Sequence, residues 1–259
     1  MSKTPITVVI LAKNEEDHLE EGLKSVHGWA DEILVIDDES TDHTVEIARR
    51  YARVITRKME NEGRHRNWSY AQARNEWVLS LDADESVSEE LKQEIDEHLA
   101  DNEKWEAFSI PIKTYIGDYW VQHSGWYPAN KVRMFMKTKQ RYEEAEVHPR
   151  VMCNIETKKL SKDIIHRGYP DIAHFLASLN RQTTLEAVKW IRTGRKMTRG
   201  KAFWRAFDRF PRIYFRKKGY KDGFIGFIVA FFASLYQVMS YAKYWELKRS
   251  QLSTAQPHK

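Results

Sequence analysis

Residues 4–12 read TPITVVILA, a run in which β-branched and other apolar residues follow one another without polar alternation. Such a run is typical of a strand that is buried on both faces, as in parallel sheets covered by helices on each side. DEILVID (31–37) and the apolar part of EWVLSLDAD (76–84) repeat the pattern. The chain is therefore expected to build its core around a parallel sheet.

Segments with helical spacing of apolar residues separate these strands. Helices are predicted at 17–26, 42–51, 64–74 and 87–100, and a further strand at 52–57. Asp42 is placed to cap the second helix, and Ser86 and Glu89 have the spacing of a capping box for the fourth. Strands that alternate with short helices indicate βαβ units and an α/β fold, whose ligands bind beyond the carboxyl ends of the strands.

Three polar segments stand at those carboxyl ends: KNEE at 13–16, DDESTD at 37–42 and DADE at 82–85. They follow separate strands but are expected to meet at one edge of the sheet. Helix capping alone explains Asp42 and Ser86, but it does not explain Asp82, Asp84 and Glu85 together, because crowded carboxylates repel one another. A divalent cation offsets such repulsion, and Mg²⁺ takes one or two carboxylates plus substrate phosphates.

Basic residues near the same edge suit a diphosphate. They are Lys13, Arg57, Arg64 and Arg66. Each alone is more often a solvated surface charge, but together beside a metal site they match the charge of a diphosphate. Neither a Walker sequence nor G-x-G-x-x-G occurs, so a P-loop or a dinucleotide-binding Rossmann site is unsupported.

The order VVILAKNEE, VIDDESTDHT, RHRN and EWVLSLDADE strongly resembles glycosyltransferase family 2, the inverting nucleotide-sugar transferases with the GT-A fold. The resemblance covers about 1–100, with four motifs in the right order and spacing. It extends more loosely through EVHPR, IIHRGYPD and LNRQTTLEA. These later pieces are similar to the branch that contains bacterial lipopolysaccharide-core β-glucosyltransferases.

The resemblance implies roles for residues of the donor site. Asp38 matches the acid that hydrogen-bonds the nucleotide base, usually uracil, and Arg66 matches a basic residue near the base and the diphosphate. In the D-x-D motif, Asp84 matches the ligand of a bridging Mg²⁺ or Mn²⁺, and Asp82 lies closer to the ribose. The nucleotide-sugar site is thereby expected to contain Leu11, Ala12, Lys13, Glu15, Asp38, Arg66, Asp82 and Ala83.

An inverting transferase also needs a general base on the acceptor hydroxyl. Related sequences carry V-H-E in the second half of the domain, whereas this chain reads EEAEVHPR, with Pro149 where Glu is expected. Glu146, just ahead of the Val-His pair, is the first choice for the base, with Glu144 and His148 as alternatives. His166 and Tyr169 also match family positions, for which a structural role is favoured.

Beyond residue 104 the pattern changes. Strands are predicted within 105–117 and 130–138, aromatic residues cluster at 115–128, and 171–194 has helical spacing. We expect a GT-A domain at 1–170, with a mainly parallel sheet flanked by helices, and a helical extension at 171–259. No internal repeat or Gly/Ser linker occurs, so the extension is expected to pack on the sheet domain.

The extension has the composition of a membrane-binding segment. Eleven Lys or Arg residues and one acid, Asp208, lie between Arg195 and Lys221, and an apolar run of sixteen residues follows at 224–239. Pro211 is expected to divide the basic region into two helices. The run is marginal for a bilayer span of about 20 residues, and a buried core helix is the alternative. Basic and aromatic residues beside it indicate an interfacial anchor at about 199–246 on an anionic leaflet, whereas nucleic acid would not explain the apolar run.

The expected function is transfer of a hexose from a nucleotide sugar to a lipid-linked saccharide such as lipopolysaccharide core. UDP-glucose is the expected donor. Its place is the cytoplasmic face of the inner membrane, as a peripheral protein, and the single cysteine, Cys153, fits a reducing compartment. A nucleotidyltransferase of similar fold would carry a glycine-rich phosphate loop, but LAKNEEDHLEEGL offers only Gly22. A non-catalytic saccharide-binding or membrane scaffold would have no use for a metal-competent D-x-D.

Overall fold

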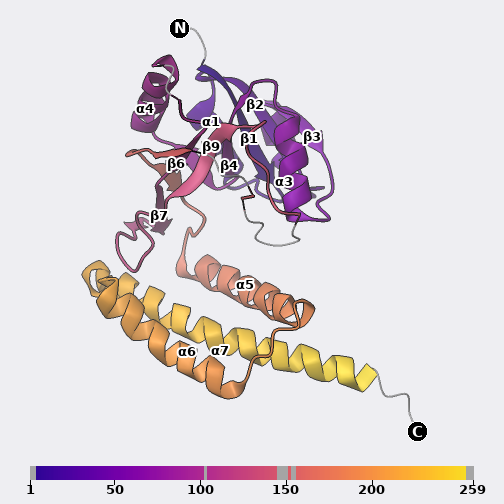
Figure 1. The fold of residues 1–259 in the computed structure, drawn as a ribbon, viewed down its shortest axis with the longest axis vertical. Helices are drawn as coiled ribbons and strands as arrows, with labels where there is room; N and C mark the ends of the chain where they lie inside the picture. The colour runs from indigo at the N-terminus through magenta and orange to yellow at the C-terminus, as the bar shows by residue number, and fades with distance from the viewer. Residues whose placement is uncertain (1–3, 102–103, 145–150, 153–155, 255–259) are drawn as a thin grey trace. The chain divides into compact units, whose positions relative to one another are not determined.

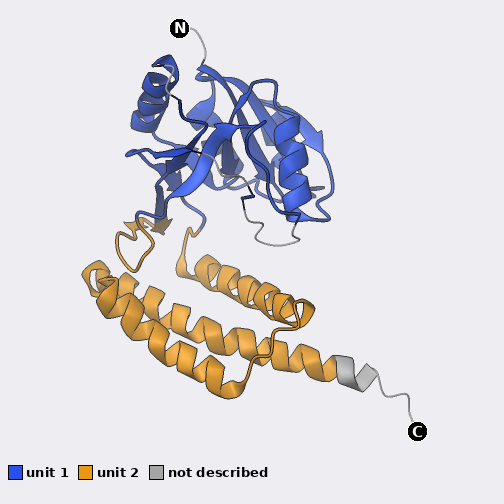
Figure 2. Cartoon of the chain, in the orientation of Figure 1, with its two compact units in different colours: residues 1–114, 128–168 blue, residues 115–127, 169–259 orange. Residues whose placement is uncertain are grey.

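The computed structural model describes residues 4–101, 104–144, 151–152 and 156–254 (Figure 1). The chain divides into two compact units (Figure 2). Unit 1 comprises 1–114 and 128–168, and unit 2 comprises 115–127 and 169–259. The aromatic segment 115–127 therefore belongs with the C-terminal helices, although unit 1 surrounds it in the sequence.

A seven-stranded sheet forms the centre of unit 1, in the order β10-β6-β9-β4-β1-β2-β3. Its strands are β1 (Thr4–Ala12), β2 (Ala30–Asp37), β3 (Arg53–Thr56), β4 (Trp77–Asp82), β6 (Ala107–Ile110), β9 (Lys131–Met136) and β10 (Thr157–Lys159). β4, β1, β2 and β3 run parallel, whereas β9 lies antiparallel between β4 and β6. The mainly parallel sheet predicted from the apolar runs is confirmed.

Helices cover both faces of this sheet because successive residues of β1 point to opposite sides. Val8 and Ile10 face a core that includes α1 (Leu19–Val26) and α4 (Glu89–Ala100), and α2 (Thr44–Arg49) belongs to the same layer. Val9 faces the other core, which contains Tyr70 of α3 (Glu62–Ala71). Both faces of β1 are therefore buried, as its unbroken apolar run predicts.

A smaller sheet holds the segment that follows β4. Its strands in unit 1 are β5 (Glu85–Val87), β11 (Ile164–His166) and β7 (Ile112–Ile116), in the order β5-β11-β7. The capping prediction was wrong by two residues, because Ser86 lies in β5 and Ser88 is the residue whose side chain accepts the Leu91 N–H bond at 3.2 Å. Gly22 lets α1 approach this strand, since a Cβ there would lie 2.6 Å from the Glu85 carbonyl oxygen.

Unit 2 consists of helices and the end of β7, which pairs with β8 (Tyr119–Trp120). Its helices are α5 (Ile172–Arg192), α6 (Arg199–Pro211), the π-helical turn η1 (Arg212–Arg216), the 3₁₀ turn η2 (Gly219–Asp222) and α7 (Gly223–Thr254). Asp171 and Thr198 cap α5 and α6. α6 ends at Pro211, where the sequence predicted a division into two helices, and a single π-helical turn follows it. α7 packs against both α5 and α6, around a separate apolar core.

One helical stretch in the described residues, Gly219–Ser250, is long and apolar enough to cross a bilayer by length and composition. Only 28% of its most apolar window is buried. The buried positions of α7 recur at helical spacing, as at Val229, Gln237 and Tyr244. Phe224 and Phe231 lie on its exposed side, at 74% and 45% exposure. The helix therefore packs with one face and leaves an aromatic face uncovered.

Candidate functional site

The carboxyl ends of β1, β2 and β4 lie side by side, since the strand order there is β4-β1-β2. Leu11 is opposite Asp82 of β4, and Ala12 is opposite Asp37 of β2. Two strand spacings separate the ends of β2 and β4, a span of about 10 Å. The structure therefore brings the three polar segments of the sequence to one edge of the sheet, with Ala12 and Ala83 buried there.

Several polar residues of these segments hold the loops together. Asn14, in the left-handed region at φ 52°, accepts the Thr41 N–H bond at 2.8 Å and donates its own N–H to Ser40 at 2.9 Å. Asp42 accepts from the N–H of Thr44 at the start of α2 at 3.0 Å. Glu15, proposed for the nucleotide-sugar site, has its carboxylate 3.3 Å from the imidazole of His18.

Asp38 follows β2 and is buried at 7% exposure. Its carboxylate accepts from Lys13 Nζ at 2.9 Å and from the Met59 N–H at 2.6 Å. Burial alone would raise the pKa of Asp38, but these two bonds and the Lys13 charge hold it below its usual value. Asp38 is therefore an ionised acceptor. The buried Nδ1 of His65 has no hydrogen-bond partner in the described part of the chain. Burial lowers the pKa of His65, and the negative charge of Asp38 partly opposes this.

Arg133 of β9 is the cation that meets two of the crowded acids. Its Nη2 lies 2.6 Å from Asp82 Oδ2 and 2.5 Å from Glu85 Oε1, and its side chain is only 7% exposed. Burial would raise the pKa of Asp82, but the charge and hydrogen bond of Arg133 lower it well below its usual value. Glu85 also accepts the Asp82 N–H bond at 2.9 Å, so it supports the strand end.

Arg66 of α3 approaches the same acid from another side. Its Nη2 is 3.7 Å from Asp82 Oδ1, and its Nε donates to Glu62 at 3.0 Å. A cavity of about 370 Å³ opens here, lined by Glu62, Arg66, Asp82, Lys131, Val132, Arg133, Tyr142 and Val151. Three basic side chains and two carboxylates therefore line this cavity at the end of β4, so its charged groups sum to a net positive charge.

Asp84 stands apart from Arg133 and is paired instead with a histidine. Its Oδ2 is 3.0 Å from Nε2 of His166, and the two side chains are 27% and 20% exposed. β11 brings His166 there because it pairs antiparallel with β5, with His166 opposite Glu85. Gly168 packs against this pair, since a Cβ on it would lie 2.2 Å from Asp84 Oδ2.

No group of three or more His, Cys, Asp or Glu side chains within the described ranges is arranged to hold a metal ion. Asp84 and His166 nevertheless form an adjacent oxygen and nitrogen donor, and both ligand types suit Mn²⁺, with carboxylate suiting Mg²⁺. Such ions keep several positions for water and substrate phosphates. The residues therefore fit an ion whose remaining ligands come from a diphosphate.

Of the three candidates for the general base, only Glu144 lies among the described residues. Glu146 and His148 lie outside the described residues. Glu144 is 49% exposed at its side chain, 3.4 Å from Arg64 and 3.3 Å from Arg141. It lines a second cavity, of about 560 Å³, rather than the cavity that contains Asp82.

Sequence reasoning missed Arg133 and gave His166 only a structural role. Arg133 lies 51 and 48 residues from its two acids, and His166 lies 82 residues from Asp84. A local pattern carries no signal for such pairs. Arg133, flanked by Val132 and Met134 in KVRMFM, is the local sign that β9 brings a charge into the core.

The family model for Glycosyl transferase family 2 matches residues 7–162, which contain the carboxyl ends of β1, β2 and β4 but not His166 or Gly168. The chain belongs to glycosyltransferase family 2. The resemblance inferred from the four motifs is thereby confirmed, as is the GT-A-like α/β fold with a mainly parallel sheet and C-terminal helices.

Relatives of this family 2 glycosyltransferase span almost its whole length. The uncharacterized glycosyltransferase RT0209 of Rickettsia typhi is 26% identical over 254 residues, which cover 93% of this chain and 87% of that protein. The lipopolysaccharide core biosynthesis glycosyltransferase LpsC of Rhizobium meliloti is 22% identical over 253 residues, covering 94% and 93%. The crystal structure of Staphylococcus aureus TarS 1-349 in complex with UDP has a TM-score of 0.46 at 17% identity, covering 99% and 93%.

Proposed function

We propose that this glycosyltransferase transfers a hexose, glucose from UDP-glucose in the first instance, to a lipid-linked saccharide of the lipopolysaccharide-core type. The observation that carries the donor assignment is the meeting of Asp38, Asp82 and Asp84 at one sheet edge. Asp38 and Asp82 are paired there with basic side chains, and Asp84 with an imidazole. The similarity to LpsC over nearly the full length of both chains supports the acceptor class. The donor sugar is identified by measuring UDP release with a series of sugar nucleotides.

The chain's own residues divide the work along that edge. Asp38, ionised and rigidly held, is placed to accept a hydrogen bond from the nucleotide base, and Leu11, Ala12 and Lys13 line the same strand end. At the end of β4, about 10 Å from the end of β2, Arg66 and Lys131 supply positive charge for the diphosphate. Arg133 keeps Asp82 fixed and ionised in the same cavity.

Asp84 and His166 are the residues proposed to hold Mg²⁺ or Mn²⁺. Such an ion, when bound, stabilises the negative charge of the departing nucleoside diphosphate. Gly168 keeps the space beside Asp84 open, because any side chain there would displace the carboxylate. The general base remains assigned to the 144–148 segment, with Glu146 as first choice.

The test of the donor site is a titration with UDP, with and without Mn²⁺, on the wild type and Asp84→Asn. The variant should melt normally, lose the Mn²⁺ dependence of UDP binding and transfer sugar about 10²-fold more slowly or worse, because metal stabilisation is worth several kcal/mol. Glu39→Gln, an exposed acid at the same edge, is the matched control. An Asp84→Asn protein with wild-type transfer and unchanged Mn²⁺ dependence would remove the metal from the proposal.

The proposed location is an anionic membrane surface at the cytoplasmic face, reached through an aromatic face of unit 2. This aromatic face consists of Phe203, Phe207, Phe224, Phe227 and Phe231. Phe203 and Phe207 are 61% and 81% exposed and one turn apart on α6. A groove of about 390 Å³, lined by Phe207 of α6 and Phe231 of α7 among others, lies between these two helices. Exposed aromatic rings beside basic residues are the composition of an interfacial helix pair.

Point variants test this location better than deletion, because removing α6 and α7 would also uncover the core of unit 2. Phe203→Ser with Phe207→Ser should weaken flotation with phosphatidylglycerol vesicles by about 10-fold or more, as two large apolar side chains leave the interface. Leu185→Ser with Val188→Ser, at exposed positions of α5, is the control. Equal vesicle binding by both pairs would contradict the assigned face.

A further inference from the structure

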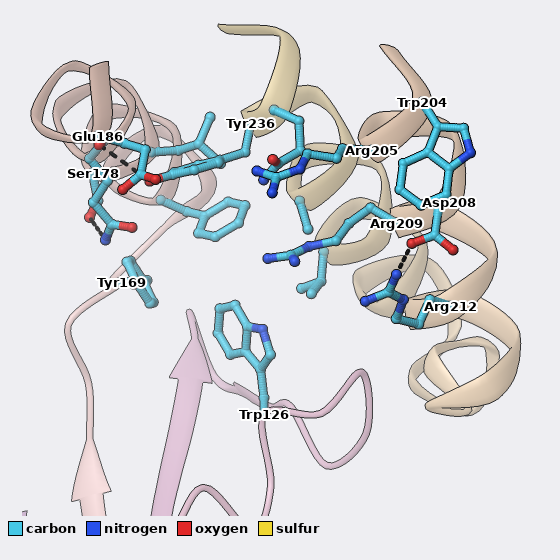
Figure 3. A pocket seen from close by; sticks show the side chains of 16 residues that line it. Trp126, Tyr169, Ser178, Glu186, Trp204, Arg205, Asp208, Arg209, Arg212 and Tyr236 are labelled. Carbon is cyan, nitrogen blue, oxygen red and sulfur yellow. Dashed lines mark hydrogen bonds and ion pairs between the residues drawn. The ribbon is translucent and has the colours of Figure 1, made fainter. Parts of the chain in front are cut away.

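A cavity of about 680 Å³ lies wholly within unit 2 (Figure 3). Its walls come from α5, α6 and α7 and from the 115–127 segment, which contributes Trp126. The volume is within the range of about 300–1,000 Å³ that is usual for small-molecule sites. It is separate from the cavity at Asp82, whose lining residues all belong to unit 1.

A row of arginines lines one side of this cavity. Arg205 and Arg209 lie on α6, and Arg212 is the first residue of η1, which continues it. Their spacing of i, i+4 and i+7 puts them on one face of this helical stretch. Arg212 is paired with Asp208. For Arg205 and Arg209, no carboxylate in the described part of the chain lies within ion-pair distance. Figure 3 shows the side chain of Arg209 extending into the space between the helices.

The arginines and the phenylalanines of α6 lie on opposite sides of the helix, although they alternate in the sequence. Phe203, Phe207 and Phe210 lie on the opposite side of α6, because they are about half a turn away from the arginines at 100° per residue. Two of these rings, Phe207 and Phe210, line the groove toward α7 rather than the cavity. The three arginines are therefore placed to meet a ligand in the cavity, not to lie under the aromatic face.

Aromatic side chains form another wall. The rings of Trp126, Tyr169 and Phe175 pack together, with centroid separations of 5.9 Å, 6.1 Å and 5.4 Å. Asp222 accepts the N–H bond of His123 at 2.8 Å and lies 2.9 Å from its Nδ1, so the segment that presents Trp126 is held in place. Amphipathic rings of this kind offer a flat apolar surface to a sugar ring.

Polar side chains line the wall between these groups. Gln182 and Glu186 of α5 and Gln237 of α7 all border the cavity. Glu186 accepts from Trp190 Nε1 at 2.6 Å, which fixes the carboxylate and leaves further acceptor capacity. Two guanidinium groups for which the described residues supply no carboxylate partner, a ring surface and two amides make a site for an anion that also carries hydroxyl groups.

We propose that this cavity binds a saccharide bearing a phosphate ester, with Arg205 and Arg209 on the phosphate and Trp126 against the sugar. Guanidinium groups bind phosphate through paired, charge-assisted hydrogen bonds. The inference rests on the proposed function for the origin of its ligand, the lipid-linked acceptor. A phospholipid headgroup offers the same phosphate ester, so the experiment separates these two sources.

The test is calorimetric titration of the full chain with glucose 6-phosphate, glucose and inorganic phosphate. Glucose 6-phosphate should bind at least about 10-fold more tightly than glucose or phosphate alone, since only it engages both the arginines and the rings. Arg205→Gln with Arg209→Gln should weaken it by about 10-fold or more. Arg199→Gln with Arg216→Gln removes the same charge from residues outside the cavity lining and should leave it within about 2-fold.

Flotation with phosphatidylglycerol and phosphatidylcholine vesicles identifies the source. If Arg205→Gln with Arg209→Gln (the cavity pair) loses only glucose 6-phosphate binding, the site is assigned to the acceptor saccharide. If it also binds phosphatidylglycerol vesicles more weakly than Arg199→Gln with Arg216→Gln (the control pair), the site is assigned to a lipid headgroup. Both results support the site. Equal glucose 6-phosphate affinity in wild type and the cavity pair, or equal losses in both pairs, overturns it. A UDP titration of each variant reports the donor site independently, so failure there counts against the proposed function and not against the cavity.

Discussion

Replacing Arg133 by Met should destabilise unit 1 and loosen the donor site together. Methionine fills a similar volume but removes the only cation within hydrogen-bond distance of Glu85 in the described structure. Breaking a buried pair by deleting one partner costs about 3–5 kcal/mol, because a charge is left buried without compensation. Glu85 is 2% exposed at its side chain but Asp82 is 39% exposed, so water compensates one of the two acids. We therefore expect the lower end, about 3 kcal/mol.

Thermal melting without metal measures this cost. For a chain of this size about 1 kcal/mol corresponds to about 2–4 °C, so the melting temperature should fall by about 6–12 °C. Arg50→Met, which breaks an exposed pair with Glu46 one helical turn away, should change it by about 1–2 °C. Adding Glu85→Gln to Arg133→Met should restore part of the loss, because one unpaired charge is gone. An Arg133→Met protein that melts like Arg50→Met would refute the assignment of Arg133 as the cation of this cluster.

Two further substitutions test the site and the sheet. Gly168→Ala would place a Cβ 2.2 Å from Asp84 Oδ2, so the carboxylate should move. The Mn²⁺-dependent part of UDP binding should then weaken by about 10-fold. An unchanged Mn²⁺ titration would show that Asp84 does not hold the ion. Glu32→Gln should lower the free energy of unfolding by about 1–3 kcal/mol at pH 7, because the carboxylate accepts from Thr7, Arg53 and the Arg74 N–H. Burial raises the pKa of Glu32, but these bonds bring it below its usual value. The difference in free energy of unfolding between wild type and Glu32→Gln should therefore be complete above about pH 4.3 and shrink at lower pH. Equal differences in denaturant unfolding at pH 7 and pH 3.5 would contradict this reasoning.

The parts of the fold that depend on local pattern were predictable. β1 occupies Thr4–Ala12, the same residues as its apolar run, because a strand buried on both faces leaves an unbroken signal. The meeting of the acidic segments followed from the parallel order alone. By contrast, β5 has three residues and exists because β11 pairs with it, so Ser86 entered a strand and Ser88 took the capping role.

The chemistry of the site was less predictable than its location. The acidic segment 82–85 indicated a compensating cation, but Arg133 compensates Asp82 and Glu85, and Asp84 is paired with His166 instead. Likewise, the period of the arginines on α6 was visible, whereas the cavity beside them depends on Trp126 and Tyr236, which lie far away in the sequence. Pairings across tens of residues are decided by packing and leave no local trace.

The inclusion of 115–127 in unit 2 has a consequence for how the protein is made. These residues leave the ribosome well before the helices that bury Ile116 and Val121, and His123 precedes its partner Asp222 by 99 residues. At about 5–20 residues per second, this segment waits on the order of 5–20 s for its partners. During that interval both partners of β9 in the sheet of unit 1, β4 and β6, are already synthesised, whereas the helices that bury the segment are not. The nascent chain therefore presents an apolar, aromatic loop to chaperones in the middle of translation, and slowing synthesis between residues 128 and 222 should lower the yield of folded protein.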